Sequence, residues 1–486
     1  MKTKTFKLTL TYILFGLLSL PSNGQNIDTL AGRHLYFDGS TNFVDTRDTS
    51  LYTNFTVECW VKSPNAPSNL QGKGPVHYEK NFQINWDHVS SGARNALLVN
   101  VSNGGWQSAT FGKLEANTWY HLVGTYDGDT LKTYTNGRLV TKKSINGGSP
   151  SRQNTSLKIG KHSSLSGAQE YFNGSVDEVR VWNIERSSEQ IQKNMFHPLS
   201  GNEPGLKHYY QFKEIVSDST LNAATGKWAP LILSPQVQKS DFPFGKGIST
   251  VLNIQAGSGQ FFNSIETGLV ALQMDSVNRS FPLLFTKLNA NFSGSKPDSN
   301  LFITQSNPYW IIQALDTGKS FRSKGMRLDY SALSPEFTIN ANQPSDIKVF
   351  NRPFSSSDEW QFVDTCEFIA FGSGHFIFKG FKEGQMALAL SKTSTSISEL
   401  KLSNSNSTRL FLNGGKELTL FFSKDDDFTE ACVLDIFGRQ VSNWQHAINK
   451  KVDKQVLIFE NSLKSGLYFL RLKSKNSENT IRFVTD

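Results

Sequence analysis

The sequence has few cysteines and little charge. Its three cysteines, Cys59, Cys366 and Cys432, stand far apart in a chain of 486 residues. An odd and dispersed set argues against a disulfide framework, and no cysteine–histidine cluster has zinc spacing. Charged residues make up 19% of the chain, and no basic run or aromatic–basic motif of a nucleic-acid binder is present. We therefore expect no nucleic-acid partner.

Long hydrophobic runs are missing beyond the N-terminus. No stretch after residue 24 approaches the 18 apolar residues of a spanning helix, so no transmembrane segment is expected in the mature chain. Residues 1–24 have the pattern of a secretory signal peptide, because three lysines precede the apolar run 8–20 and small residues follow it. The segment predicts an exported protein.

Residues typical of strands and turns are abundant. The chain contains 36 Phe and 37 Gly but only 5 Met. Helical periodicity is confined to a short stretch near 187–195, and Gly-containing turns separate many alternating segments. The predicted fold class is all-β, and the length predicts two to four domains.

Four strand motifs follow one another in the first half of the chain. They are Leu35-Tyr-Phe-Asp-Gly39, Phe55-Thr-Val-Glu-Cys-Trp-Val-Lys62, Thr118-Trp-Tyr-His-Leu-Val-Gly-Thr-Tyr-Asp127 and Phe172-Asn-Gly-Ser-Val-Asp-Glu-Val-Arg-Val-Trp-Asn183. Their order and spacing resemble the laminin-G-like, concanavalin A-like jelly roll of secreted proteins. The resemblance implies a jelly roll over residues 31–215, and the proline-containing stretch 216–250 is expected to be a linker.

Two further domains are expected after the linker. Residues 251–390 contain Pro308-Tyr-Trp-Ile-Ile312 and His375-Phe-Ile-Phe-Lys-Gly-Phe381, and they resemble a β-sandwich module found before the secretion tail of Bacteroidota surface proteins. Residues 400–486 contain Phe437-Gly-Arg439 and Leu463-Lys-Ser-Gly-Leu-Tyr-Phe-Leu-Arg471, and they resemble the C-terminal sorting domain of type IX secretion substrates, without its usual Tyr-Pro-Asn-Pro opening. The resemblance implies a secreted or cell-surface protein, exported through the inner membrane by the signal peptide and through the outer membrane by the type IX machinery.

Three aromatic residues are candidates for sugar binding. Tyr78, Trp86 and Trp106 lie on or beside the variable loops of the jelly roll. Aromatic rings there stack on pyranose faces, while polar groups orient the hydroxyls. The alternative is packing in the core, which we favour for Trp106.

A structural Ca²⁺ is the main metal candidate. The resemblance to the jelly-roll family implies a site near Asp38, Gly39 and Asp177, since relatives often coordinate an ion between an early turn and the penultimate strand. The alternative is that Asp38 makes an Asx turn before Gly39, and that Asp177 pairs with Arg180.

No catalytic residues are predicted. Related glucanases place their two carboxylates on one strand as Glu-x-Asp-x-Glu, and this spacing is absent. Asp177 and Glu178 come nearest, but neighbours on a strand are expected on opposite faces. Nucleophile-elbow, phosphate-loop and His-Glu-x-x-His motifs are absent as well.

The sequence therefore favours a non-catalytic binding protein that recognises a polysaccharide or a cell-surface protein through the jelly roll. A structural or adhesive surface protein without a sugar site is the second hypothesis. A glycan-active enzyme is the third, and it would require acids that converge from separate strands.

Overall fold

The computed structural model of the chain has two compact units, Met1–Thr393 and Ser394–Asp486. The structure describes residues 32–485 except 69–71, 88–94, 146, 152–153, 164–169, 258–260, 275–276, 278, 291–300, 303–308, 317–322, 330–346, 354–358, 367, 371–374, 379–381, 392–408, 414–416, 422–428, 436–438, 446–453, 460–462, 464–465 and 475–477. The predicted signal peptide 1–24 lies outside the described residues. Nearly all regular structure is β, so the predicted all-β class is confirmed.

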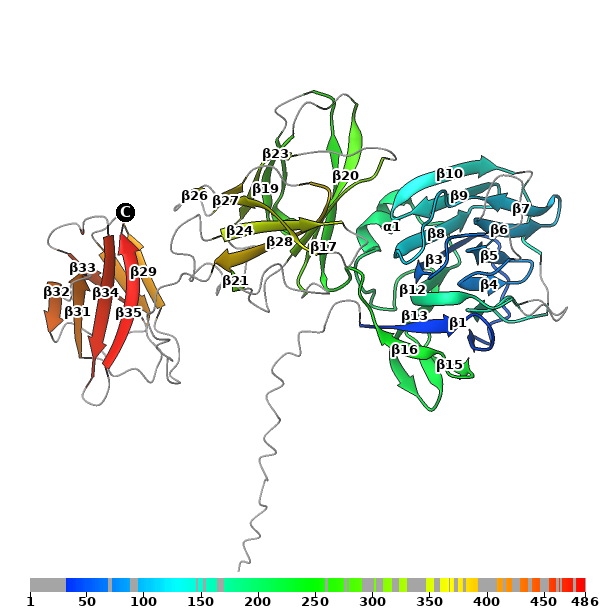
Figure 1. The fold of residues 1–486 in the computed structure, drawn as a ribbon, viewed down its shortest axis with the longest axis horizontal. Coiled ribbons are helices and arrows are strands. Elements are labelled where there is room, and N and C mark those ends of the chain that lie inside the picture. Colours follow the sequence, from blue (N-terminus) through cyan, green and yellow to red (C-terminus); the bar gives the residue numbers. More distant parts are fainter. Residues whose placement is uncertain are drawn as a thin grey trace, which may run out of the picture. The chain divides into compact units, whose positions relative to one another are not determined.

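The first domain is a sandwich of antiparallel strands with one short helix (Figure 1). Its strands are β1 (Arg33–Asp38), β2 (Phe43–Asp45), β3 (Phe55–Lys62), β4 (Val76–Tyr78), β5 (Phe82–Asn85), β6 (Ala96–Val101), β7 (Gly105–Ala109), β8 (Tyr120–Tyr126), β9 (Thr130–Thr135), β10 (Arg138–Ser144), β11 (Lys158–Ile159), β12 (Asn173–Trp182), β13 (Leu206–Val216), β14 (Ser219–Asn222), β15 (Lys227–Ile232) and β16 (Gln236–Lys239). The first sheet has the order β10-β9-β8-β3-β12-β13, and the second has the order β2-β11-β4-β5-β6-β7.

The helix α1 (Ser188–Asn194) begins at the stretch whose periodicity predicted it. Ser187 caps its N-terminus, because its side chain accepts a hydrogen bond from the backbone N–H of Gln190, and Gln190 bonds back in a capping box. Ile191 is buried on its inner side. The helix lies on the outer side of the first sheet, where Ile191 packs with Val123 and Tyr134.

Residues 216–239 are part of the jelly roll and residues 247–250 begin a strand of the second domain, so the prediction of a linker over 216–250 is wrong. Strand β14 pairs with β13 and β15, and β15 pairs with β2, which joins the two sheets. Strand β16 then returns to pair with β1, where Arg33 is the partner of Lys239. The prolines misled the prediction because Pro230 lies within β15 and Pro235 and Pro243 flank β16. Short strands of four to six residues tolerate such flanks.

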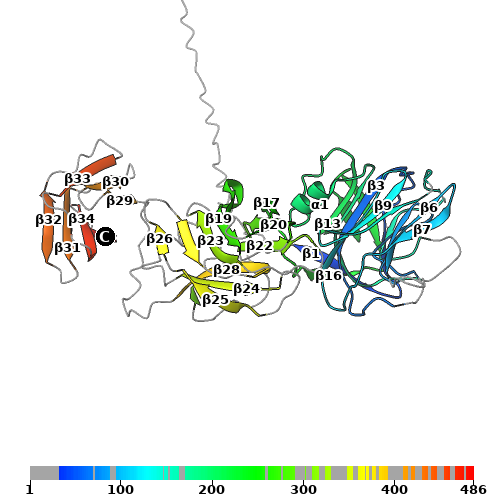
Figure 2. The same cartoon turned by 90° about the horizontal axis from the view of Figure 1, so that it is seen from above.

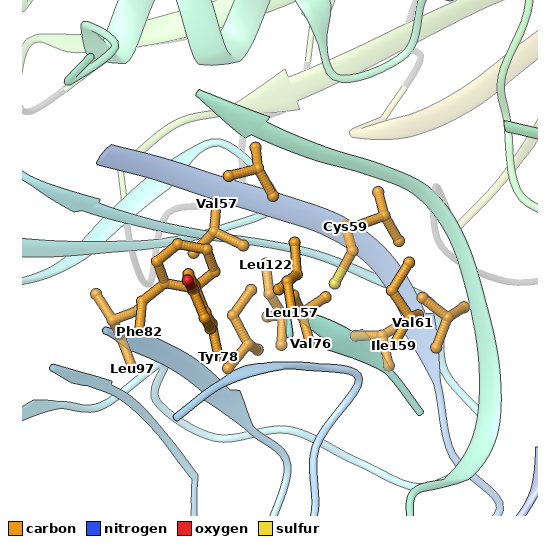
Figure 3. Close-up of a cluster of buried hydrophobic side chains, with 14 of the residues drawn as sticks. Val57, Cys59, Val61, Val76, Tyr78, Phe82, Leu97, Leu122, Leu157 and Ile159 are labelled. Carbon is orange, nitrogen blue, oxygen red and sulfur yellow. The ribbon is translucent and has the colours of Figure 1, made fainter. Parts of the chain in front are cut away.

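The core lies between the two sheets. In β3 every second side chain faces it, and Figure 3 shows Val57, Cys59 and Val61 against side chains of the second sheet, among them Val76 and Phe82. All five side chains are completely buried. Cys59 is therefore a small apolar core residue on the inward face of the alternating strand.

The opposite side of the first sheet is closed by the second domain. Trp60 packs against Phe242 with ring centroids 4.5 Å apart, and its Nε1 donates a hydrogen bond to the Met195 carbonyl oxygen at 2.9 Å. The same buried cluster includes Leu284 and Ile311 of the second domain. A shared apolar core of this kind couples two domains in folding.

The second domain contains two further antiparallel sheets (Figure 2). One is formed by β17 (Gly247–Ile254), β20 (Phe281–Leu288), β21 (Leu301–Phe302), β22 (Tyr309–Ala314), β24 (Ile347–Arg352), β25 (Gln361–Thr365) and β28 (Gly384–Ser391). The other is formed by β18 (Phe261–Ser264), β19 (Leu269–Met274), β23 (Ser323–Asp329), β26 (Phe368–Ala370) and β27 (His375–Phe378), with a short 3₁₀ turn at Ile265–Thr267.

The C-terminal unit is a small β structure. Its strands are β29 (Arg409–Asn413), β30 (Glu417–Phe421), β31 (Glu430–Asp435), β32 (Gln440–Gln445), β33 (Lys454–Ile458), β34 (Gly466–Lys473) and β35 (Glu478–Thr485). They pair as β29-β30-β33 and as β32-β31-β34-β35. The motif residues Tyr468, Leu470 and Arg471 lie on β34, between β31 and β35.

Candidate functional site

The second sheet of the jelly roll turns one face to the core and carries polar side chains on the other. Val76 and Ile84 face the core, whereas His77, Gln83 and Asn85 alternate with them and face outward. These three polar side chains are nevertheless buried. His77 and Asn85 form a hydrogen bond of 2.5 Å, and burial lowers the pKa of His77 well below its ordinary value.

Cross-strand pairing aligns the outward positions in one row, which we call the outer row. Five positions are in register across β11, β4, β5, β6 and β7: Lys158, His77, Gln83, Leu98 and Ser108. Neighbouring strands lie about 4.8 Å apart, so four spacings make the row roughly 19 Å long. His77 and Gln83 in the row are at most 3% exposed, so only its two ends are open to solvent.

Trp106 lies at the open end of this face. It pairs with Asn100 across β7 and β6, two residues beyond the outer row. Its side chain is 44% exposed, while Leu98, Asn100 and Ser108 around it are half-buried. The expectation that Trp106 packs in the core is wrong. The next residue, Gln107, pairs with the core residue Val99, so Trp106 falls on the opposite face.

Tyr78 and Trp86 lie on the core side instead. Each is 1% exposed and belongs to the central cluster of the jelly roll. The Tyr78 hydroxyl donates to the Ser50 carbonyl oxygen at 2.7 Å, and Trp86 Nε1 donates to the Asn65 carbonyl oxygen at 3.0 Å. A ring without an exposed face cannot stack on a sugar. The structure therefore separates Trp106 from the other two predicted residues.

The predicted calcium ligands do not come together. Asp38 ends β1 and pairs with Asn173, which precedes Asp177 by four residues on β12. At about 3.4 Å per residue, Asp38 and Asp177 are separated by roughly 13 Å along the strand. Oxygen ligands of one Ca²⁺ must all lie within about 2.6 Å of it. Asp38, Gly39 and Asp177 are thus not one coordination set in this structure.

Each of the two aspartates has local partners. The Asp38 carboxylate accepts hydrogen bonds from the backbone N–H groups of Ser40 and Thr41, both at 2.8 Å, and these form the Asx turn that was the alternative. Burial opposes their effect, but the bond from the Thr41 hydroxyl and the backbone bonds together lower the pKa of Asp38 to about 2. Asp177 is completely buried and accepts a hydrogen bond from the Ser240 hydroxyl at 2.6 Å.

A β-bulge overturns the expectation that Asp177 and Glu178 face opposite sides. Asp177 pairs with Trp60 and Arg180 pairs with Glu58, so two residues of β12 oppose Cys59 alone. Glu178 has a φ of 50°. Its carboxylate turns to Arg180 at 3.0 Å on the covered side. Both acids are at most 1% exposed and cannot reach a substrate.

A cluster that the sequence did not reveal lies over β4. His162 Nε2 is 3.6 Å from Glu79 Oε2 and 3.7 Å from Glu170 Oε2, so the two carboxylate oxygens are at most 7.3 Å apart. The His162 ring lies 4.1 Å from that of His77. Glu79 also accepts a hydrogen bond from Gln83 Nε2 at 3.2 Å. His77 lies on β4, Glu79 directly follows it, and His162 and Glu170 come from the segment before β12, so no sequence motif links them.

Burial dominates the electrostatics of this cluster. It raises the pKa of both Glu79 and Glu170 and lowers the pKa of His162 to about 4. At neutral pH the imidazole is therefore neutral and stands between the two carboxyl groups. Two carboxylates at this separation are compatible with a glycosidase, but the imidazole occupies the space that substrate and water would need.

Acidification is expected to destabilise the fold through two histidines. Burial, aided at His34 by Lys62, lowers the folded-state pKa of His34 and of His162 to about 4, while an unfolded histidine titrates near 6.5. The unfolded state therefore binds more protons between these values, and stability falls as pH drops from about 6.5 to 4. Glu79 and Glu170 act in the opposite direction, because their folded pKa is raised.

The measurement is the free energy of unfolding in urea at several pH values. His34→Gln and His162→Gln should each flatten the fall on the acid side, and the double variant should flatten it further. An unchanged slope in all three variants would show that neither histidine is held neutral by the fold.

Within the described residues, no group of three or more His, Cys, Asp or Glu side chains is arranged to hold a metal ion. Over the same part of the chain, no helix is long and apolar enough to cross a membrane.

Residues 38–192 match the family model of the concanavalin A-like lectin/glucanases superfamily. No curated protein matches the chain. Among solved structures, the chain is similar to a proposed carbohydrate-binding protein from Bacteroides ovatus, with 21% identity and a TM-score of 0.36 over 44% of this chain and 61% of that protein.

Two other solved structures are similar over about a third of the chain. One is the native heptameric SAP-like pentraxin of Limulus polyphemus, with 16% identity and a TM-score of 0.25 over 33% of this chain and 80% of that chain. The other is domain 4 of an extracellular arabinanase from Geobacillus stearothermophilus in complex with arabinotriose, with 21% identity and a TM-score of 0.27 over 34% and 77%. The family match and the two-sheet sandwich together identify the first domain of the chain as a concanavalin A-like domain.

Proposed function

We propose that the chain is a non-catalytic glycan-binding protein, and that the glycan lies on the outer face of β6 and β7. The observation that carries the proposal is Trp106, which is 44% exposed on the polar face of the second sheet. An indole ring offers a flat apolar surface to a sugar ring at little entropic cost. Asn100 and Ser108 beside it supply an amide and a hydroxyl that hydrogen-bond to sugar hydroxyls.

The coverage of the two sheets supports this choice of face. The first sheet buries its outer side against α1 and the second domain. Trp60 and Trp119 are buried in that contact and cannot stack on a sugar. The second sheet keeps half-buried and exposed side chains on its outer face at β6 and β7, whereas His77 and Gln83 of β4 and β5 are buried. A sugar ring has access to the exposed indole of Trp106 there.

A glycan-active enzyme is the second candidate, and the convergence of Glu79 and Glu170 on His162 is the observation that favours it. It ranks below binding because their side chains are only 11% and 13% exposed and have a neutral imidazole between them. A structural or adhesive role, with a surface protein as partner, is the outcome if no glycan is retained.

The cellular setting is part of the proposal. The signal-peptide pattern of residues 1–24 and the motifs of residues 400–486 support a secreted or surface protein that uses the type IX machinery, as in Bacteroidota. The residues first expected to bind calcium lie apart. Calcium dependence of binding is therefore tested directly, with and without EDTA.

Trp106→Ala is expected to weaken retention of the full chain on its glycan about tenfold or more, since an aromatic contact residue of this kind contributes at least 1–2 kcal/mol. The measurement is retention on a panel of insoluble and arrayed polysaccharides, with calcium and with EDTA. Trp228→Ala is the matched control, because Trp228 is also 44% exposed but lies on β15.

Equal retention of the Trp106 and Trp228 variants on the glycan would show that the binding site does not include Trp106 on β7. If the full chain releases soluble reducing ends from a polysaccharide and Glu79→Gln does not, the protein is a glycan-hydrolysing enzyme and the proposal of a non-catalytic binding protein is wrong. Loss of retention in EDTA alone would establish calcium dependence of the binding.

A further inference from the structure

The outer face carries a second feature at its other end, where two lysines share one aromatic ring. The Lys158 ammonium lies 5.2 Å from the centroid of the Phe43 ring, and the Lys161 ammonium lies 4.8 Å from it. Lys161 is also 4.7 Å from the centroid of the Tyr171 ring. We call Phe43, Lys158, Lys161 and Tyr171 the lysine–aromatic cluster.

The local topology brings these residues together. Lys158 begins β11 and pairs with Asp45 of β2, two residues after Phe43. Lys161 and Tyr171 form an isolated antiparallel bridge just beyond β11. The cluster therefore sits at the β2–β11 side of the outer face, and Lys158 is itself a member of the outer row. Four strand spacings, about 19 Å, separate β11 from β7, where Trp106 lies.

The charges of the cluster are not balanced. Lys158 forms an ion pair with Asp45 at 3.2 Å, and the same carboxylate accepts a hydrogen bond from Ser156. Lys161 makes no ion pair with any described residue, and its ammonium is held only by the two ring faces. Two ammonium groups on one ring repel each other, and a single carboxylate leaves one positive charge in excess. Such an arrangement is stabilised by an anion from outside.

We propose that Lys161 binds an acidic group of the glycan, a carboxylate or a sulfate ester, so that the ligand of this face is an anionic polysaccharide. The inference rests on the proposed function and adds the chemical class of the ligand. A sugar ring stacked on Trp106 would direct the rest of an extended chain over the cluster of Glu79, Glu170 and His162, which covers His77 and Gln83. An acidic residue of that chain would reach Lys161. The aromatic rings fix the ammonium in place, which reduces the side-chain entropy lost on binding.

The test compares the full chain, Trp106→Ala and three lysine variants on three ligands: a neutral glucan, polygalacturonate and a sulfated galactan. Lys161→Gln should weaken binding to at least one anionic ligand about tenfold, the loss expected for one charge-assisted hydrogen bond. Lys161→Arg, which keeps the charge, should retain most of it. Lys142→Gln on the exposed strand β10 removes the same charge elsewhere and should leave binding unchanged.

Ionic strength gives a second readout. Binding of the anionic ligand should weaken as salt rises from about 0.05 to 0.5 M, and the salt dependence should be smaller in Lys161→Gln. Equal losses in Lys161→Gln and Lys142→Gln would reduce the effect to net charge and overturn the inference. Trp106-dependent binding of the neutral glucan alone would overturn it and leave the proposed function standing. No Trp106-dependent binding to any glycan would overturn both.

Discussion

Glu58→Gln is expected to lower the free energy of unfolding by about 3–5 kcal/mol at neutral pH, the cost of breaking a buried ion pair by removing one partner. Glu58 is completely buried on β3, and its Oε1 accepts hydrogen bonds from Trp182 Nε1 at 2.9 Å and from Arg186 at 3.4 Å. Its Oε2 lies 3.1 Å from His121 Nε2. The substitution would leave the buried Arg186 guanidinium without the carboxylate that it pairs with.

The pH dependence of this effect has a definite sign. Burial alone would raise the pKa of Glu58, but the bond from His121 and the charges of Arg180 and Arg186 hold it well below its usual range. Because the folded pKa is depressed, the contribution is present above the unfolded value near 4.3 and is lost as pH falls below it. The difference between Glu58→Gln and the unmodified chain should therefore shrink in acid.

Urea denaturation followed by tryptophan fluorescence measures the loss. Glu115→Gln is the control, since Glu115 pairs with Lys113 at 2.9 Å on the surface with 63% of its side chain exposed. An exposed pair is worth at most about 1 kcal/mol. Similar losses in the two variants would mean that the network around Glu58 contributes no more than a surface ion pair.

Trp60→Ala is expected to cost about 3–5 kcal/mol and to weaken the coupling of the first two domains. The indole fills the junction between β3 and the second domain, with Phe242 stacked on it at 4.5 Å and Phe196 at 5.7 Å. Its removal would leave a cavity and an unpaired Met195 carbonyl oxygen where the indole N–H now donates. Calorimetry should then resolve two transitions where the unmodified chain shows one for residues up to 393.

Trp228→Ala again serves as the control, because the exposed indole of Trp228 leaves no cavity when it is removed. A single transition in Trp60→Ala, shifted no more than in Trp228→Ala, would contradict the role of Trp60 at the junction. Because Trp60 lies away from the outer face, glycan retention by the folded variant should be unchanged.

Local patterns predicted the strands well. The alternation of Phe55–Lys62 predicted β3, and the periodicity near 187–195 predicted α1. These features depend on neighbours within a few residues, which is why a single sequence reveals them. The stretch 216–250 was misassigned because its strands are short and pair with β1, β2 and β13, partners that local composition does not indicate.

The candidate site was less accessible to sequence reasoning. Trp86 and Trp106 look alike in the sequence, and only the register of β5, β6 and β7 sends one ring to the core and the other to the surface. The bulge at Glu178 reversed one expected orientation for the same reason. Glu79, His162 and Glu170 come together through the pairing of β4 with β11, so their spacing along the chain does not predict the cluster.

The pairing of β1 with β16 has a practical consequence for protein engineering. Since Arg33 faces Lys239, and the backbone N–H of Ser240 donates to the Gly32 carbonyl oxygen at 3.1 Å, the chain enters and leaves the jelly roll at adjacent points. Adjacent ends are what insertion into a surface loop of a host protein and circular permutation require. A graft cut at residue 215 would discard β14, β15 and β16. A transplantable module should instead span residues 32–245, with Phe242 kept over Trp60 and Phe244 against Phe242.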